Sequence, residues 1–356
     1  MGNPTAFSAA PPAPGADASP RAAGPAFPPS VPALFLAWAK PSHSRRSQLM
    51  AQRLGIPLRR IHVLKMKPYL APLRYAAQAV LTLVTLFRER PRLVLVQNPP
   101  IFAPLFAWLY CALTGAGLVI DSHTDAVQGP LWQWSWGLHG WLSRRALTTL
   151  VTNAHLQSVV QGWGAACHVI TDVPSDLPAG TPYPLAHPFN VVLVSSFAPD
   201  EPLDAVIAAA RDLPEVGFYV TGDPVQGFKR LPKDLPANLH LTGFLPDDRY
   251  YGLLRSAQAV MALTTEDHTN QRGACEAVWV DQPVITSDWP FLRETFHRGT
   301  VHVDNSAEGI RAGVRRMQAE HAQLAAEIRL LQAERRRQWE TAVATLAELA
   351  ARVERR

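Results

Sequence analysis

Cysteine is scarce in this chain of 356 residues, which contains only Cys111, Cys167 and Cys275, all in apolar or helical surroundings. An odd and sparse set of thiols predicts a reducing, cytoplasmic compartment and excludes a disulfide framework. The three positions also lack the close sequence spacing of a zinc site. We therefore expect neither a bound metal nor a cofactor.

Charged residues are nearly absent from positions 1–30, where Ala, Pro, Gly and Ser dominate. Such a segment cannot bury enough apolar surface to fold, so we expect a disordered tail. No basic stretch precedes an apolar one in this tail, which argues against a secretory signal.

Charge is missing altogether from residues 101–120, a run of 20 residues that reaches the length of a membrane span. Pro104 and the Gly115-Ala116-Gly117 turn divide this run into a helix and a strand. A buried helix followed by a buried parallel strand explains the apolar character without lipid, and we prefer that interpretation.

Acidic residues are few in the first half of the chain. Residues 31–180 hold 14 Lys and Arg against 5 Asp and Glu, whereas residues 181–356 hold 19 basic and 23 acidic residues. A basic half fits a nucleic acid or an anionic membrane surface. Aromatic residues are not interleaved with the basic ones, so we predict no nucleic-acid partner and a peripheral position on the inner face of the cell membrane.

The helix expected at 69–87 is the candidate for that membrane contact. Basic residues lie at both of its ends, at Lys65, Lys67, Arg74, Arg88 and Arg90. Its exposed side would meet anionic lipid, although packing on a sheet explains its apolar spacing equally well.

Strand and helix patterns alternate from residue 31 to residue 305, over a length that fits two domains. We predict an α/β chain with two doubly wound, Rossmann-like parallel sheets, at 31–175 and 189–305, that face a cleft. The Pro-rich segment 176–188 is the expected linker. Residues 306–356 predict a long, charged helical segment that crosses back to the first domain, with Trp339 as its anchor.

Residues 261–288 carry the strongest ligand-binding signals. A loop and then a helix expected from Gly273 would present unpaired backbone N–H groups and a positive dipole end, which suits a diphosphate. Arg272 adds a charged fork, and Glu276 is placed to accept hydrogen bonds from ribose or sugar hydroxyls. The alternative is an ordinary N-capped surface helix. The loop itself offers Thr264, Thr265, His268 and Thr269.

Titratable groups also gather after the strand expected at 117–120, in the first domain. Asp121, His123 and Asp125 follow it within five residues, at the strand end where doubly wound domains bind ligands. More ionisable groups meet there than a helix cap needs, so these residues are the candidate general base and its partners. The alternative is that Thr124 or Asp125 merely caps the next helix.

The sequence of residues 276–284, EAVWVDQPV, resembles the E-A-x-A-x-G-x-P-V signature of GT-B glycosyltransferases, especially family 4 and its relatives. In that family the residue at Glu276 touches the ribose of the donor. His268 stands where the family has a second Glu that contacts the donor sugar, and Asp281 replaces the usual Gly. The resemblance also implies that the loop with Ser195 and Ser196, and the turn at Gly222, border the donor phosphates.

Three further segments resemble the chitobiosyldiphosphodolichol mannosyltransferases. The basic loop at 44–47 is similar to their G-R-S-P-R loop, residues 96–100 read V-Q-N-P-P as theirs do, and residues 121–123 match D-x-H. The resemblance implies that the loop at 44–47 faces the phosphates of a lipid-linked or glycan acceptor. The implied acceptor-binding residues are Ser44, Arg45, Arg46, Ser47 and Asn98. Four tryptophans between 128 and 141 would pack on the core or form an apolar rim for such an acceptor.

Together these features predict a glycosyltransferase that moves a sugar from a nucleoside diphosphate donor to a membrane-linked acceptor in surface or exopolysaccharide assembly. Backbone N–H groups and Arg272 would stabilise the leaving diphosphate without a metal. Two alternatives remain. One is a sugar-nucleotide epimerase of the same fold, and the other is a degenerate subunit that binds a partner glycosyltransferase.

Overall fold

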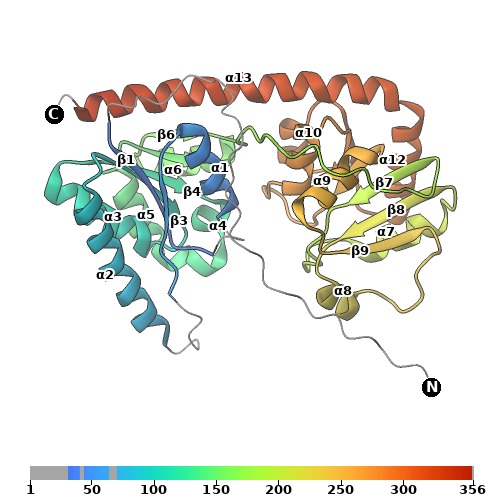
Figure 1. The fold of residues 1–356 in the computed structure, drawn as a ribbon, viewed down its shortest axis with the longest axis horizontal. Coiled ribbons are helices and arrows are strands. Elements are labelled where there is room, and N and C mark those ends of the chain that lie inside the picture. The colour runs from blue at the N-terminus through green and yellow to red at the C-terminus, as the bar shows by residue number, and fades with distance from the viewer. Residues whose placement is uncertain (1–30, 41–43, 64–69, 355–356) are drawn as a thin grey trace.

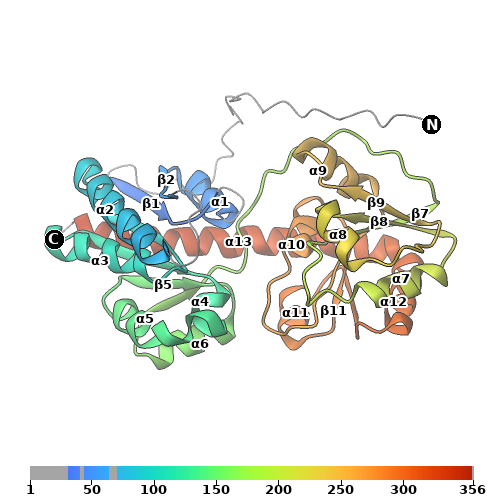
Figure 2. The ribbon, with the colours of Figure 1, turned by 90° about the horizontal axis from the view of Figure 1, so that it is seen from below.

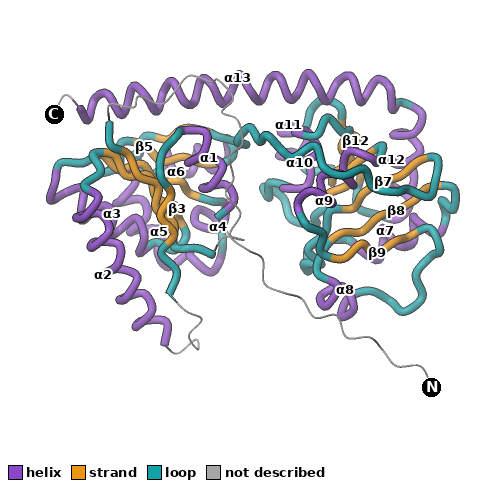
Figure 3. The backbone as a smooth tube through the Cα atoms, viewed as in Figure 1, coloured by secondary structure: helices purple, strands orange, loops and turns teal. Residues whose placement is uncertain are grey.

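The computed structural model describes residues 31–40, 44–63 and 70–354. The predicted disordered tail at 1–30 and the basic residues Lys65 and Lys67 lie outside the described residues. Within them, the strands form two separate sheets (Figure 3). Each sheet has six strands, and every strand pair is parallel.

The first sheet has the strand order β2-β1-β3-β4-β5-β6. Its central strands β1, β3 and β4 are buried throughout, because helices cover both faces of the sheet. Helices α2, α3 and α5 pack on one face, and α1 packs on the other. The strands are β1 (Ala33–Ala37), β2 (Leu58–Arg60), β3 (Leu93–Asn98), β4 (Gly117–Ser122), β5 (Thr148–Val151) and β6 (Cys167–Val169). The helices are α1 (Arg45–Leu54), α2 (Ala71–Glu89), α3 (Phe102–Thr114), α4 (Thr124–Gln128), the 3-10 helix η3 (Pro130–Ser135), α5 (Trp136–Ser143) and α6 (Ala154–Gly162).

The second sheet has the strand order β12-β11-β10-β7-β8-β9. Helices α7 and α12 pack on one face, and α9, α10 and α11 pack on the other. The strands are β7 (Phe189–Leu193), β8 (Val216–Thr221), β9 (Leu239–Gly243), β10 (Ala259–Ala262), β11 (Val284–Ser287) and β12 (Thr300–Val303). The helices are α7 (Leu203–Arg211), α8 (Pro224–Arg230), α9 (Asp247–Ser256), α10 (Arg272–Trp279), α11 (Pro290–Thr295) and α12 (Ala307–Ala319).

The long helix α13 (His321–Glu354) belongs to both domains. It runs past the second domain and then the first (Figures 1 and 2). Ile328 and Leu331 from its first half are buried in the core of the second domain, whereas Trp339 and Val343 are buried in the core of the first. The helix therefore packs on both domains, with Trp339 buried in the first.

The predicted doubly wound α/β architecture is confirmed, and residues 101–120 form the helix α3, buried except in its last turn, and the start of the buried strand β4. Among the described residues, no helix is both long enough and apolar enough to span a membrane. The domain boundaries drawn at 175, 188 and 305 stay predictions.

Two element predictions were wrong in detail. The basic segment at 44–47 is not a loop, because α1 already begins at Arg45. The helical segment predicted at 306–356 is not continuous, because it is broken at Glu320 between α12 and α13. Strand and helix types follow from apolar periodicity, whereas ends and breaks depend on capping and packing.

Candidate functional site

Side chains from the two domains meet where the strands of both sheets end. Arg45, which follows β1, donates a hydrogen bond to the hydroxyl of Tyr251 on α9, at 3.1 Å. His155 on α6 stacks on His268, which follows β10, with ring centroids 4.1 Å apart. The carboxyl ends of parallel strands are where open α/β sheets bind ligands, so the two sets of loops form one candidate site.

Asp121 is the buried charge on the first-domain edge of this site. Asp121 is the next-to-last residue of β4. Its carboxylate is fully buried and accepts a hydrogen bond from Arg46 Nε at 3.1 Å. His123 Nε2 lies 3.5 Å from the other carboxylate oxygen. Burial by itself would raise the pKa of Asp121, but the Arg46 guanidinium and His123 outweigh it and hold that pKa below its ordinary value. The strand end therefore carries an ionised carboxylate beside a partly exposed imidazole.

Asp125, the third predicted member of this group, is exposed in the first turn of α4. A different residue, His139 on α5, completes the buried cluster. Its Nε2 lies 2.9 Å from Ser122 Oγ and 3.1 Å from Asn98 Nδ2. Burial lowers the pKa of His139 to about 4, so the ring is neutral near pH 7 and ties the ends of β3 and β4 together. Sequence reasoning missed His139 because it lies in the middle of a helix, far from any motif.

The residues predicted to bind an acceptor make contacts within the protein. Ser44 Oγ accepts a hydrogen bond from Arg60 Nε at 2.9 Å, and Ser47 Oγ donates to Gln97 at 2.9 Å. Arg46 pairs with Asp121, and Asn98 is buried against His139. These residues lie at the carboxyl ends of the strands of the first sheet, where they form hydrogen bonds within the protein. Their acceptor-binding role stays a prediction.

Glu276 and Arg272 form the centre of the second-domain edge. Arg272 Nε donates to Glu276 Oε1 at 2.9 Å, one turn along α10, and Tyr250 donates its hydroxyl proton to Glu276 Oε2 at 2.6 Å. The Arg272 side chain is half exposed, whereas Glu276 is buried. Gly273 is required beside them, because a Cβ there would lie 2.6 Å from the Cβ of Val194. The close approach of α10 to the end of β7 thus depends on that glycine.

The hydroxyl-rich loop after β10 is tied to the loop after β7. Thr264 Oγ1 donates to Asp200 at 2.7 Å, and the Thr265 N–H donates to the Asp200 carbonyl at 2.7 Å. Thr264 is fully buried, whereas Thr265 and Thr269 are not. Of the predicted donor-binding threonines, Thr264 therefore supports the loop, and the other two remain open to a ligand.

Ser195 and Ser196 hold a carboxylate from their own loop. Both hydroxyls donate to Glu201, as do the N–H groups of Ser196 and Phe197, at 2.8 and 3.2 Å. Gly222 lies beside this loop with a φ of +124°, and a Cβ there would come within 2.6 Å of the Ser195 carbonyl. The donors predicted to meet the phosphates of a nucleotide are thus occupied by Glu201, which sequence reasoning did not single out.

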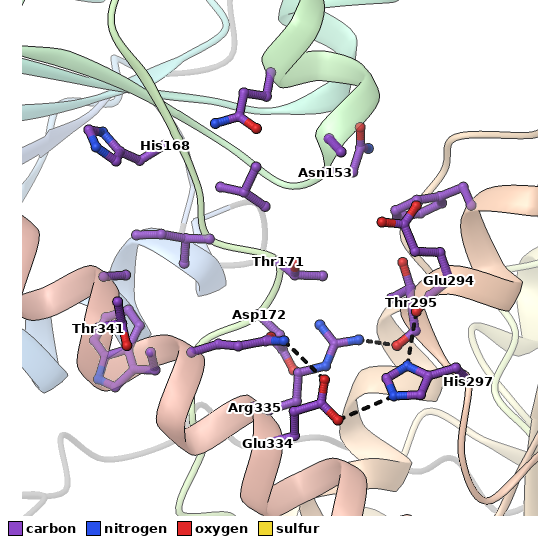
Figure 4. A pocket seen from close by; sticks show the side chains of 18 of the residues that line it. Asn153, His168, Thr171, Asp172, Glu294, Thr295, His297, Glu334, Arg335 and Thr341 are labelled. Carbon is purple, nitrogen blue, oxygen red and sulfur yellow. Dashed lines mark hydrogen bonds and ion pairs between the residues drawn. The ribbon is translucent and has the colours of Figure 1, made fainter.

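A large cavity opens between the domains beneath α13, with a volume of about 780 Å³ (Figure 4). Residues of α6 and of the chain after β6 line it from the first domain, residues around α11 line it from the second, and α13 closes it. Asp172 connects the cavity to α10, because its carboxylate accepts a hydrogen bond from the Trp279 indole at 2.6 Å. No sequence motif marked this cavity.

Comparison with known proteins gives the fold a family context. Residues 204–351 match a family model described as glycosyl transferase-like. Anabaena HepE in complex with UDP and glucose superposes with a TM-score of 0.62 at 15% identity, over 89% of this chain and 99% of HepE. The chain has the GT-B fold, and its residues 204–351 are similar to glycosyl transferases. Among curated proteins, none matches the sequence.

Other GT-B structures are similar to a comparable degree. Sucrose-phosphate synthase from Thermosynechococcus elongatus gives a TM-score of 0.65 at 13% identity, over 90% of this chain and 98% of the synthase. A candidate UDP-N-acetylglucosamine 2-epimerase from Listeria monocytogenes gives 0.59 at 12% identity, over 84% and 91% of the two chains. The predicted GT-B fold and glycosyltransferase resemblance are confirmed. The closer resemblance to family 4 and to the mannosyltransferases stays a prediction.

Proposed function

We propose that the chain is a glycosyltransferase that moves a sugar from a nucleoside diphosphate donor to an acceptor held by the first domain. One observation carries this proposal. In a GT-B fold, a half-exposed arginine and a buried carboxylate on α10 of the second domain share a site with an ionised carboxylate and an imidazole at the end of β4.

The donor binds at the beginning of α10. The first turn of this helix presents backbone N–H groups, and Arg272 can turn its half-exposed guanidinium from Glu276 to a diphosphate. Glu276 then accepts hydrogen bonds from ribose or sugar hydroxyls. Anabaena HepE, which shares this fold, is known in complex with UDP and with UDP-glucose, which supports a uridine nucleotide as the first donor to test.

The acceptor hydroxyl loses its proton to His123. The imidazole is partly exposed, and the carboxylate of Asp121 lies 3.5 Å from its Nε2, where it can orient the ring as a carboxylate often does for a catalytic base. Asp125 is a weaker candidate because it is exposed and away from this pair. Helix N–H groups and Arg272 stabilise the leaving diphosphate. If the configuration at the sugar is retained, the donor phosphate takes the proton and His123 matters less.

A membrane-linked acceptor is supported by the outer face of α2. Leu73, Val80, Val84 and Phe87 recur there at helical spacing, and each is about half exposed. Trp134 of η3 is a further exposed apolar side chain of the first domain. Exposed apolar area of this extent marks an interaction surface. Nearby basic residues, Arg74, Arg88 and Arg90, would face anionic headgroups.

Vesicle flotation tests the membrane part of the proposal. We expect the protein to float with vesicles that contain phosphatidylglycerol and to be released at about 0.5 M salt, because each surface Lys or Arg contributes about 1 kcal/mol that salt screens. Val80→Asp and Val84→Asp should abolish flotation, whereas Leu330→Asp, at an exposed apolar position on α13, should not. Equal flotation with neutral vesicles would contradict an anionic membrane surface as the partner.

Mass spectrometry with a panel of sugar nucleotides tests the activity itself. The purified protein should release the nucleoside diphosphate from one donor, faster with membrane lipid extract than without it. Transfer of the sugar to lipid supports the proposal. The absence of turnover with every donor, with or without lipid extract, contradicts it. Surface or exopolysaccharide assembly is the process in which such a reaction would serve.

Two specific observations favour other functions. The similarity to the Listeria epimerase favours a sugar-nucleotide epimerase, which would yield an epimer of the intact donor. Glu201, whose carboxylate occupies the Ser195 and Ser196 donors, favours a degenerate subunit that binds no nucleotide. Product analysis distinguishes an epimerase from a glycosyltransferase. Calorimetry with UDP distinguishes a degenerate subunit, which would bind no nucleotide, from both.

A further inference from the structure

The cavity beneath α13 lies between four parts of the molecule: α6, the chain after β6, α11 and α13 (Figure 4). Its volume of about 780 Å³ is within the range of sites that bind small molecules, about 300–1,000 Å³. The donor-binding residues proposed above, on α10 and on the loop after β10, are not among those that line it. It is therefore available for a second ligand.

Asn153 is the clearest sign that this cavity holds a ligand. Its Oδ1 caps α6 by accepting a hydrogen bond from the Leu156 N–H at 2.8 Å. Its Nδ2 is buried and has no hydrogen-bond partner, although the residue is only 5% exposed and lines the cavity. A buried amide N–H without an acceptor is costly, and a ligand oxygen would remove that cost.

Other polar groups around the cavity are open to hydrogen bonding. Among the described residues, no partner is present for the Thr171 hydroxyl, the Trp339 indole N–H or the Glu294 carboxylate. The lining thus offers both hydrogen-bond donors and acceptors, beside the apolar side chains of Phe291 and Ile170. A sugar presents the same combination, since each hydroxyl both donates and accepts and each ring carries apolar C–H faces.

The charge of the lining distinguishes a sugar from a nucleotide. Three carboxylates line the cavity, those of Asp172, Glu294 and Glu334, against one guanidinium, that of Arg335. Arg335 is almost fully buried and donates to the Thr295 carbonyl, and Glu334 lies 3.2 Å from His297. The excess of carboxylates repels phosphate, so a neutral, hydroxyl-rich ligand fits better than an anion.

We propose that this cavity binds a neutral saccharide, which is the glycan of the acceptor if the chain is the glycosyltransferase proposed above. Two contacts connect it to the donor helix. Asp172 accepts a hydrogen bond from Trp279 of α10, and the Thr171 carbonyl accepts one from Asn270, just before α10, at 3.2 Å. A glycan seated here contacts the segment that positions Arg272 and Glu276. The cavity would therefore select the glycan to which the enzyme adds a sugar.

Saturation-transfer NMR on the full chain tests this inference directly. The probes are methyl glucoside, methyl mannoside, N-acetylglucosamine and cellobiose, with inorganic phosphate as the anion and no nucleotide present. We expect at least one saccharide to bind, and we expect added phosphate to leave the saturation-transfer signals of that saccharide unchanged. Absence of binding by every saccharide, or competition of phosphate with the saccharide, overturns the proposal.

Three variants locate the saccharide. Asn153→Asp keeps the oxygen that caps α6 and removes the unpartnered N–H, so affinity should fall by about two- to tenfold, the worth of one neutral hydrogen bond. Ala154→Phe places a large side chain at an exposed position of the lining and should lower affinity more than tenfold. Glu308→Gln, exposed on α12 and outside the cavity, is the matched control and should bind normally. Normal binding by the first two variants overturns the proposal.

UDP calorimetry on the same proteins separates this inference from the proposed function. UDP binding without any saccharide binding refutes the cavity site and leaves the glycosyltransferase proposal standing. Saccharide binding that both cavity variants weaken, without UDP binding, supports the cavity site and refutes the donor site. Folding of each variant is checked by its thermal unfolding midpoint.

Discussion

Each edge of the interdomain site contains an arginine bound to a carboxylate, but the two pairs are built differently. Arg46 and Asp121 come from separate elements, α1 and β4, and the Arg46 side chain is 15% exposed while Asp121 is fully buried. Arg272 and Glu276 lie one turn apart on α10, and the Arg272 side chain is 50% exposed. The first pair is locked by the packing of two elements, whereas the second depends on one helix and is open to water.

This difference assigns different tasks to the two edges. An ion pair that is buried between packed elements cannot change partners without disturbing the fold, so Asp121 provides a fixed negative charge beside His123. An exposed arginine exchanges partners at little cost, so under the proposed function Arg272 would leave Glu276 for the diphosphate of the donor. The first edge therefore suits chemistry, and the second suits binding.

The largest expected effect concerns turnover at the first-domain edge, which contains Arg46, Asp121 and His123. His123→Ala should lower kcat by about 10²–10⁴-fold, because a positioned base contributes that much, and should leave the affinity for UDP intact. Asp125→Asn, at an exposed position, is the control and should retain most activity. Steady-state kinetics with calorimetry makes the comparison. Near-normal turnover of His123→Ala would move the reaction away from the end of β4.

Carboxylate-to-amide substitutions at the two edges compare their contribution to stability. Asp121→Asn leaves the Arg46 guanidinium without its counter-charge and should lower the free energy of unfolding by about 3 kcal/mol. Glu276→Gln should lower it by only about 1 kcal/mol, because water replaces the lost partner of the half-exposed Arg272. Urea unfolding measures both values. Equal losses would mean that the two pairs do not differ as their burial indicates.

Acid should weaken the fixed edge through His139. Burial lowers its pKa to about 4 from an ordinary value of about 6.5, so the folded state binds its proton less readily than the unfolded state. Stability from this group is complete above about pH 6.5 and is lost as the pH falls to about 4, by about 3 kcal/mol. His139→Gln should flatten this part of the pH profile, and His62→Gln, at an exposed position, should not. A profile of His139→Gln as steep as that of the wild type would exclude His139 as the cause.

The remaining comparison concerns the affinity of the second-domain edge for nucleotide. Arg272→Ala and Glu276→Gln should each weaken UDP binding by about 1.5–3 kcal/mol, the value of one charge-assisted hydrogen bond. Arg46→Gln, at the other edge, should leave UDP affinity unchanged. Calorimetry with UDP and GDP provides the measurement. If both α10 variants bound nucleotide as tightly as the wild type, the donor would bind elsewhere.

Most of the architecture was predictable from the sequence. Apolar runs of strand length, such as the one that became β3, alternate with helical periodicity, and this pattern alone indicates parallel sheets covered by helices. The position of Arg272 and Glu276 at the beginning of a helix was equally local, because spacing along one helix fixes which side chains meet. Helix boundaries such as the break at Glu320 depend on the packing of α13 and were missed.

Only the tertiary structure determined which side chains from distant parts of the chain form hydrogen bonds and ion pairs. Arg46 meets Asp121 across 75 residues, and His139 meets Asn98 across 41 residues. The carboxylate of Glu201 occupies a loop whose serines resembled a phosphate site, and the cavity beneath α13 needs α6, α11 and the last helix at once. Local sequence determines which elements form and which residues share one face of an element. Contacts between elements follow from the way two sheets and a shared helix pack together, which no short segment of the sequence encodes.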